Sequence, residues 1–226
     1  MCMLTWKQGF QKMATRKINF MQGEYYHVYN RGVDKRDIFM SLEDRERFFL
    51  SMKLFNIEEP IGSIYEHSFV VDKPVVGNKL VDFVCFCLNP NHYHFLITAK
   101  VDNGIQKFMQ RLGTGYTKYF NEKYKRNGSL FQGKFKAVHI SSNEYLLHVS
   151  AYINLNDRIH QLGSKASKSS WQEYLNNPNQ SFCDKKIILE QFKNIQEYST
   201  FAISSANESL IRKSKEKAFE NLYIED

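Results

Sequence analysis

Residues 80–99 read LVDFVCFCLNPNHYHFLITA, and this stretch decides the fold. It contains two runs with the composition of strands, Leu80–Leu88 and His92–Ala99. Asn89-Pro90-Asn91 separates the two runs, and Asn and Pro are typical turn residues. The stretch therefore predicts two strands that pair antiparallel across a short turn.

The second of these strands begins with two histidines, His92 and His94, on either side of Tyr93. Side chains at positions i and i+2 of a strand point to the same side of the sheet, so both imidazoles can meet one metal ion. Taken alone, a His-x-His pair on a strand is more often structural than metal-binding. The metal hypothesis therefore needs support from another part of the chain.

That support comes from residues 146–156, which read LLHVSAYINLN and are typical of a helix. Ser141-Ser142-Asn143-Glu144 precedes them and forms a capping box, which marks the start of a helix. Tyr152 and Asn156 are four residues apart and so lie one turn apart on one helix face. Metal ligands on a strand, with a phenol and a third ligand on a helix, suggest a nuclease that attacks DNA with tyrosine.

The rest of the chain predicts further alternating elements. Gly113 and Gly115 lie inside one expected helix, where each costs about 1 kcal/mol relative to Ala, so they indicate a break or a close approach to another backbone. Residues 58–79, which contain two Pro and two Gly, look like a loop or hairpin excursion. The order of strands and helices is that of an α+β protein. The expected strands are 24–31 and 134–140, and the expected helices are 42–57 and 104–125.

Composition narrows the class of protein. The 226 residues are 42% hydrophobic and 24% charged, which is enough for one buried core and an appendage. The net charge of +7 favours a polyanionic partner. The four cysteines have no zinc-type spacing and are expected to be reduced thiols in a cytoplasm. No window approaches the length of a membrane helix, and residues 1–20 have no continuous apolar core of a secretory signal.

Four segments resemble, in order and spacing, the successive motifs of the IS200-like single-tyrosine (HUH) transposases. The resemblance is closest to the branch called REP-associated tyrosine transposases. Four motifs in order are far more specific than any one of them. The segments are YHVYNRG at 26–32, CLNPNHYHFLI at 87–97, LFQGKFK at 130–136 and YINLN at 152–156.

The resemblance implies a fold and a domain organisation. The family's core is an antiparallel sheet with helices against one face, similar to an RNA-recognition-motif or ferredoxin-like core. We expect an N-terminal extension at 1–20 and a catalytic domain at 21–162. The segment 163–226 begins with the Lys/Ser-rich stretch 164–170 and then has two amphipathic patterns, so we expect a linker and a small C-terminal helical appendage there.

The resemblance also implies the chemistry. Tyr152 would be the nucleophile that forms a 5′-phosphotyrosine, and Tyr116, on another helix, is the second candidate. His92 and His94 would bind Mg²⁺ or Mn²⁺ together with Asn156, because the family uses the residue four after the tyrosine as a ligand. The family has proline after this residue. Here Asp157 follows, which could change how the helix ends or add a ligand.

His148 lies one turn before Tyr152 and either assists proton transfer or borders the site. The expected partner is single-stranded DNA with a hairpin, bound by a monomer or a homodimer in the cytoplasm and nucleoid of a bacterium. A non-catalytic DNA-binding protein on the same fold is the main alternative, and a two-histidine phosphoesterase is disfavoured because its two His-x-Ser motifs lie too close together in the chain. The candidate DNA contacts combine aromatic, amide and cationic side chains. They are Asn30, Arg31, Arg111, Phe131, Gln132, Lys134 and Lys136.

Overall fold

A computed structural model describes residues 18–62, 64, 77–162, 166–176 and 181–222, with side chains described as far as residue 212. Most of the expected N-terminal extension, 1–20, and most of the expected excursion at 58–79 lie outside these residues. Ile18 and Phe20, which are described, pack against the main hydrophobic core.

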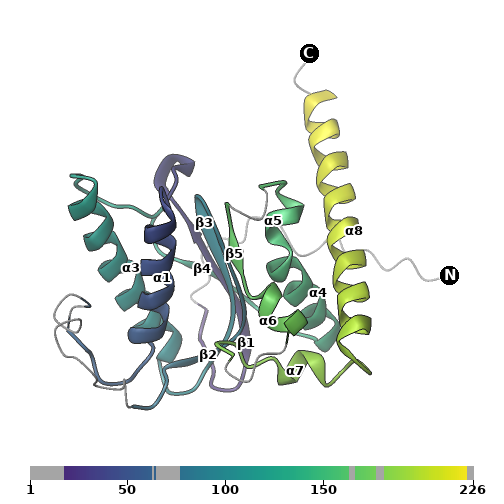
Figure 1. The fold of residues 1–226 in the computed structure, drawn as a ribbon, viewed down its shortest axis with the longest axis horizontal. Helices are drawn as coiled ribbons and strands as arrows, with labels where there is room; N and C mark the ends of the chain where they lie inside the picture. The colour runs from purple at the N-terminus through teal and green to yellow at the C-terminus, as the bar shows by residue number, and fades with distance from the viewer. Residues whose placement is uncertain (1–17, 63, 65–76, 163–165, 177–180, 223–226) are drawn as a thin grey trace.

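A five-stranded sheet forms the centre of the molecule, with strand order β4-β1-β3-β2-β5 (Figure 1). Every pair of neighbouring strands is antiparallel. The strands confirm the predicted pairing across Asn89-Pro90-Asn91 and the two further predicted strands, 24–31 and 134–140. Their bounds are β1 Tyr25–Arg31, β2 Val81–Asn89, β3 His92–Ala99, β4 Lys136–His139 and β5 Lys168–Ser169.

Helices cover both faces of this sheet (Figure 1). One face carries α1 (Leu42–Leu54) and α3 (Gly104–Lys123), as the sequence and the family resemblance predict. The short helix η1 (Val33–Lys35) follows β1. The other face is also covered, which extends the expected architecture of helices on one face only. The helices there are α4 (Asn143–Asn154), α5 (Asn156–Ile159), α6 (Trp171–Asn176), α7 (Lys186–Leu189) and α8 (Ile195–Leu222).

The composition of the central strands explains the second layer. Cys85, Cys87 and Leu96 point to this second face and are all fully buried. A sheet with apolar side chains on both faces must be covered on both sides, and a strand buried on both faces has a nearly continuous apolar sequence. Residues 83–88, FVCFCL, have that pattern. The α+β fold class is confirmed, with two helical layers around one sheet.

The helix α3 is continuous, so the two glycines do not break it. A Cβ atom added at Gly115 would lie 2.6 Å from the Phe55 ring, whereas one at Gly113 would meet no atom within 4 Å. The predicted close approach therefore exists at Gly115, and the neighbour is a side chain rather than a backbone.

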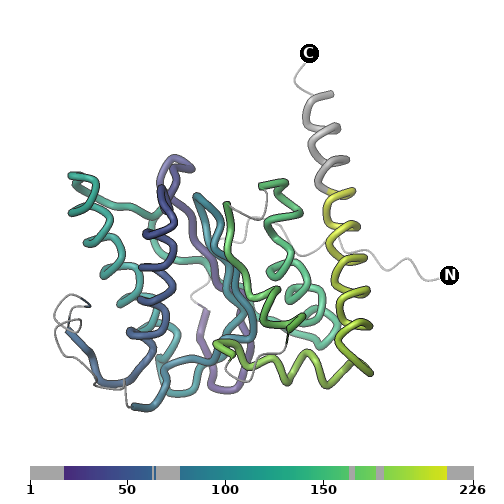
Figure 2. Tube along the Cα trace, in the orientation of Figure 1, coloured from purple at the N-terminus to yellow at the C-terminus, as the bar shows by residue number. Residues whose placement is uncertain are grey.

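The C-terminal segment packs on the same sheet as the rest of the chain. β5 pairs with β2, so part of the stretch expected as a linker is a strand (Figure 1). Figure 2 shows the chain trace of this segment beside the central sheet. The Tyr174 hydroxyl donates to the Val84 carbonyl oxygen at 2.9 Å, and Tyr198 is fully buried between α4 and α6. The segment thus contributes a strand to the sheet and α6, α7 and α8 to the second helical layer, whereas Phe182 and Cys183 pack with the core of the first face.

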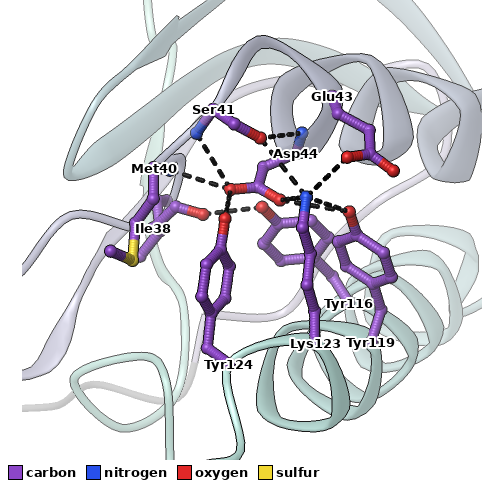
Figure 3. Close-up of polar contacts among 9 residues, drawn as sticks. All are labelled: Ile38, Met40, Ser41, Glu43, Asp44, Tyr116, Tyr119, Lys123 and Tyr124. Carbon is purple, nitrogen blue, oxygen red and sulfur yellow. Dashed lines mark hydrogen bonds and ion pairs between the residues drawn. The ribbon is translucent and has the colours of Figure 1, made fainter.

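Asp44, at the start of α1, joins the two helices of the first layer (Figure 3). Ser41 and Asp44 form a capping box, in which Asp44 accepts from the Ser41 and Met40 backbone N–H groups at 3.0 and 2.9 Å. The same carboxylate accepts from Lys123 Nζ at 2.8 Å and from the Tyr124 hydroxyl at 2.7 Å. Asp44 is 0% exposed, so these contacts stabilise a buried charge.

We expect Asp44→Asn to lower the free energy of unfolding by about 3 kcal/mol at neutral pH, because it leaves Lys123 without its buried partner. Burial alone would raise the pKa of the Asp44 carboxyl, but hydrogen bonds from Lys123, Tyr124 and Met40 hold that pKa below its ordinary value. A lowered folded pKa stabilises the protein above the ordinary pKa, and this contribution is lost as the pH falls through the folded value. Denaturant unfolding at several pH values measures both effects.

The control for this prediction is Glu43→Gln. Glu43 binds the same Lys123 Nζ at 2.8 Å, but its side chain is 77% exposed, so its loss should change stability by less than about 1 kcal/mol. Equal losses in the two variants would contradict the role of the buried carboxylate.

Candidate active site

The expected metal ligands lie on the sheet face that α4 covers. His92 and His94 share this face of β3, with ring centroids 5.1 Å apart and ring planes nearly perpendicular. In the neighbouring strands Arg31 and Asn89 lie opposite His92, and Tyr29 and Cys87 lie opposite His94. Directly opposite residues on one face have neighbouring side chains. The sheet register therefore surrounds the two histidines with specific neighbours.

His27 on β1 is the side-chain hydrogen-bond partner of His94. Its Nε2 lies 2.8 Å from His94 Nδ1, and the two rings stack with centroids 5.0 Å apart. Burial lowers the pKa of His27 to about 4, so His27 is neutral near pH 7. Sequence reasoning missed this residue. The signal was its place in the first motif, but only the pairing of β1 with β3 brings it to His94.

The tautomer of His92 follows from its neighbours. Asn91 Nδ2 donates to the Lys35 carbonyl oxygen at 3.1 Å, which turns Asn91 Oδ1 toward His92 Nδ1. An amide oxygen is only an acceptor, so His92 carries its proton on Nδ1 and its lone pair on Nε2. His92 thus presents Nε2 as a potential metal ligand.

Asn156 lies next to His92 through a second amide. Asn89 Nδ2 donates to Asn156 Oδ1 at 2.6 Å and lies 2.9 Å from His92 Nε2. Asn156 is 0% exposed, and its Nδ2 has no hydrogen-bond partner of normal geometry. Asn156 Oδ1 and the lone pair on His92 Nε2 therefore point toward the same place.

The ring of Tyr152 on α4 lies close to the rings of His94 and His27. Its ring centroid is 5.7 Å from that of His94 and 6.2 Å from that of His27, both edge to face. Burial raises the pKa of the Tyr152 hydroxyl, whereas the Asn156 side chain and the positive charge of Arg212 on α8 act to lower it. The phenol is thus protonated at neutral pH and needs charge stabilisation to react.

Tyr116, the second candidate nucleophile, lies in the core under the opposite face of the sheet. It is 0% exposed, and its hydroxyl donates to the Ile38 carbonyl oxygen at 2.6 Å (Figure 3). Its ring packs against Phe48 and Phe39. A phenol in this position cannot reach a DNA phosphate.

The helix that carries Tyr152 differs slightly from its prediction. Its N-cap is Ser142 rather than Ser141, and Ser142 Oγ accepts from Tyr145 N. The helix α4 ends at Asn154, Leu155 has non-helical backbone angles, and Asn156 begins α5. The expected unbroken helix through Asn156 is therefore wrong, although Tyr152 and Asn156 remain on the same side of the site.

Two further histidines lie near this region. His148 Nδ1 lies 2.8 Å from Ser205 Oγ, and its ring packs against Phe201, so the structure places His148 in the contact between α4 and α8. The exposed His160, at the end of α5, lies with its ring 5.2 Å from that of His92. Sequence reasoning did not identify His160, because no motif includes it.

The expected DNA contacts fall into two groups. Arg31 donates to Gln132 Oε1, and Asn30 donates to the Gly133 carbonyl oxygen at 3.2 Å, which joins the first and third motifs beside His92. Lys134 and Lys136 are exposed nearby, and Lys136 pairs with Tyr29 across the sheet.

The second group of expected DNA contacts, Phe131 and Arg111, lies away from the exposed surface beside the histidines. Phe131 is 7% exposed and packs edge to face on Tyr93, so it is a core residue, and the interpretation of its ring as an exposed stacking surface needs correction. Arg111 lies on α3, against the opposite face of the sheet, where it donates to the carbonyl oxygens of Ile57 and Glu58. The structure does not bring Arg111 to the histidines.

The donor set fits a hard divalent cation. Two imidazole nitrogens and an amide oxygen leave coordination positions of Mg²⁺ or Mn²⁺ open for phosphate oxygens and water, and the lone pairs on His92 Nε2 and Asn156 Oδ1 point to one place. Within the described residues, no three His, Cys, Asp or Glu side chains gather into a potential metal cluster. An amide as the third ligand is compatible with that finding.

Comparison with known proteins gives a match to part of the chain and a structural likeness. Residues 64–156 match the family described as "Transposase IS200 like", and this span holds three of the four segments that carry the resemblance. The match includes the His92-Tyr93-His94 motif and ends at Asn156. No curated protein matches the chain.

Among solved structures, the chain is similar to one described as "Structure of the REP associates tyrosine transposase bound to a REP hairpin". The two share 11% sequence identity with a TM-score of 0.47, over 75% of this chain and 90% of that chain. None of the helices within the described residues has the length and hydropathy of a membrane-spanning segment.

Proposed function

We propose that the protein is a metal-dependent tyrosine transposase or endonuclease that cuts and rejoins single-stranded DNA at hairpin sites. The observation that carries the proposal is the placement of Tyr152 against His94, with His92 and Asn156 beside it, on one face of the sheet. The family match and the resemblance of the motifs to the REP-associated branch support this class of substrate.

In the proposed reaction, the Tyr152 oxygen attacks the phosphorus of one phosphodiester. A Tyr152 O–P bond forms and the P–O3′ bond breaks. The phenol loses its proton and the leaving 3′-oxygen takes one up, so the products are a 5′-phosphotyrosine and a 3′-hydroxyl. Attack of a 3′-hydroxyl on the phosphotyrosine reverses the step and rejoins DNA. One phosphodiester is exchanged for another, so no ATP is required.

The surrounding residues would prepare this step. His92 Nε2, His94 and Asn156 Oδ1 would hold Mg²⁺ or Mn²⁺, which neutralises charge on the phosphate oxygens. His27 and Asn91 keep the two imidazoles oriented through their Nδ1 atoms. Arg31, opposite His92, and the exposed Lys136, opposite Tyr29, would bind phosphates on either side of the scissile bond.

We expect hairpin binding by Tyr152→Phe to match that of the wild type, because recognition rests on phosphates and bases rather than on the phenol. Affinity should fall steeply with salt as counterions are released. The double variant Arg31→Gln, Lys136→Gln should reduce the slope of log K against log[salt] by about 1.5 to 2. Fluorescence anisotropy at several salt concentrations measures the slope.

A matched control replaces cations on the opposite sheet face. Lys107→Gln, Lys118→Gln changes the net charge by the same amount on α3. It should leave the slope unchanged, and an affinity that does not vary with salt in the wild type would contradict the electrostatic part of the proposal.

A non-catalytic DNA-binding protein on the same fold is the second candidate. A protein that only binds DNA does not need two imidazoles, an amide oxygen and a phenol on one face of a sheet. The formation of a covalent adduct separates the two functions.

The active unit would be a monomer or a homodimer, and sedimentation with and without hairpin DNA distinguishes them.

A further inference from the structure

Asn89, the last residue of β2, lies between two of the expected metal ligands. It is 0% exposed, and its Nδ2 donates to Asn156 Oδ1 at 2.6 Å and lies 2.9 Å from His92 Nε2. On its other side, Asn89 Oδ1 accepts from Ser167 Oγ at 2.8 Å and lies 3.4 Å from Cys87 Sγ. No motif used above gives Asn89 a role beyond the turn.

The amide nitrogen of Asn89 occupies the place to which the ligand lone pairs point. His92 has its lone pair on Nε2 because Asn91 holds the Nδ1 proton, and Asn156 presents its oxygen. Both atoms lie within hydrogen-bond distance of Asn89 Nδ2. A cation that takes these two lone pairs removes the acceptors of the Asn89 N–H groups, so the Asn89 amide cannot keep its orientation.

A half-turn about the Cβ–Cγ bond of Asn89 resolves this conflict. It exchanges Oδ1 and Nδ2, so that an oxygen faces His92 and Asn156. Ser167 can then accept instead of donate, because a hydroxyl does both, and the Cys87 sulfur is also a weak acceptor. The rotation therefore keeps a hydrogen-bond partner on the buried side of the amide.

The spacing also suits a shared ion. Ligands at neighbouring corners of an octahedral site lie about 3 Å apart, because each lies about 2.1 Å from the ion. The Asn89 amide atom is 2.6 Å from Asn156 Oδ1 and 2.9 Å from His92 Nε2. An oxygen at this position needs only a small adjustment to act as a ligand.

We propose that Asn89 is a fourth protein ligand of the metal, through Oδ1, with its amide turned by half a turn from the orientation in which Nδ2 faces His92 and Asn156. The inference rests on the proposed function, because it takes His92, His94 and Asn156 as the other ligands. It adds a second amide oxygen, which favours a hard cation such as Mg²⁺ or Mn²⁺ over a soft one.

Mn²⁺ binding to the full chain tests the inference without DNA and without activity. The free ion is measured by electron paramagnetic resonance in wild type, Asn89→Asp and Asn89→Leu, and thermal melting confirms that each variant is folded. We expect Asn89→Leu to bind Mn²⁺ about tenfold or more weakly, because it has no oxygen. Asn89→Asp should bind at least as tightly as the wild type, because a carboxylate oxygen stands in the same place.

The control is Asn56→Leu. Asn56 is a buried amide that binds the Val81 backbone, on the other face of the sheet, so its loss lowers stability and should leave Mn²⁺ affinity unchanged. Mg²⁺ should also shift the side-chain carbonyl resonance of Asn89 in the wild type. Two results would overturn the inference about Asn89 and leave the proposed function standing. One is equal Mn²⁺ affinity in wild type and Asn89→Leu, and the other is weaker Mn²⁺ binding by Asn89→Asp than by Asn89→Leu. A wild type that binds no Mn²⁺ overturns the metal part of the proposed function with it.

Discussion

Tyr152→Phe is expected to form no covalent adduct with hairpin DNA and to lose cleavage by about a thousandfold or more, the scale of loss when a nucleophile is removed. The substitution deletes only the hydroxyl, so the ring contacts with His94 and His27 remain. Wild-type protein, incubated with Mn²⁺ and single-stranded DNA that contains a hairpin, should yield an adduct that peptide mapping assigns to Tyr152. A water nucleophile would instead release a free 5′-phosphate.

The matched control is Tyr29→Phe. Tyr29 is another phenol at the site, and its ring stacks on that of His94 with centroids 5.7 Å apart. It lies on β1, whereas Tyr152 lies on α4. This variant should still form the adduct. If Tyr152→Phe cleaves at the wild-type rate, or if the adduct maps to Tyr29, the assignment of the nucleophile is wrong even though the family match stands.

His92→Ala and His94→Ala are expected to lose metal-dependent cleavage by at least about a hundredfold while the fold is preserved. Each removes one imidazole from the proposed ligand set, and the remaining histidine and amide oxygens would hold the ion more weakly. His94→Ala should also be less stable than His92→Ala by about 1–3 kcal/mol, because it leaves the buried His27 without its partner. Cleavage assays over a range of Mn²⁺ concentrations, together with denaturant unfolding, measure both effects.

His139→Ala is the control for these two variants. His139 lies on β4 and pairs with Glu24 at 2.8 Å, where its side chain is 46% exposed. It should cleave DNA normally. Cleavage at the wild-type rate by either His92→Ala or His94→Ala would exclude that histidine from the reaction.

Much of the fold follows from local sequence. Leu80–Leu88 and His92–Ala99 predict the β2–β3 pair because the strand composition and the Asn-Pro-Asn turn are both local signals. The capping residues Ser141-Ser142-Asn143-Glu144 likewise predict the start of α4 within one residue. The two-residue period of a strand is also enough to predict that His92 and His94 lie on the same face of the sheet.

Other features depend on contacts between distant residues. His27 and Asn89 belong to the site only because β1 and β2 pair with β3 in one particular register. Phe131 was interpreted as a DNA contact from its basic neighbours, but Tyr93 and the core beneath it bury its ring. Arg111 was interpreted in the same way, yet α3 lies on the opposite face of the sheet.

The sequence by itself determined the α+β class, the hairpin that carries the two histidines, and the helix that carries Tyr152, because strand period, turn chemistry and helix capping act over a few residues. Only the tertiary structure decided which polar groups surround those residues. Hydrogen-bond partners such as His27 for His94, and Asn89 for Asn156, are 67 residues apart in the chain. Strand register and helix packing bring them together, and no short sequence pattern encodes that distance.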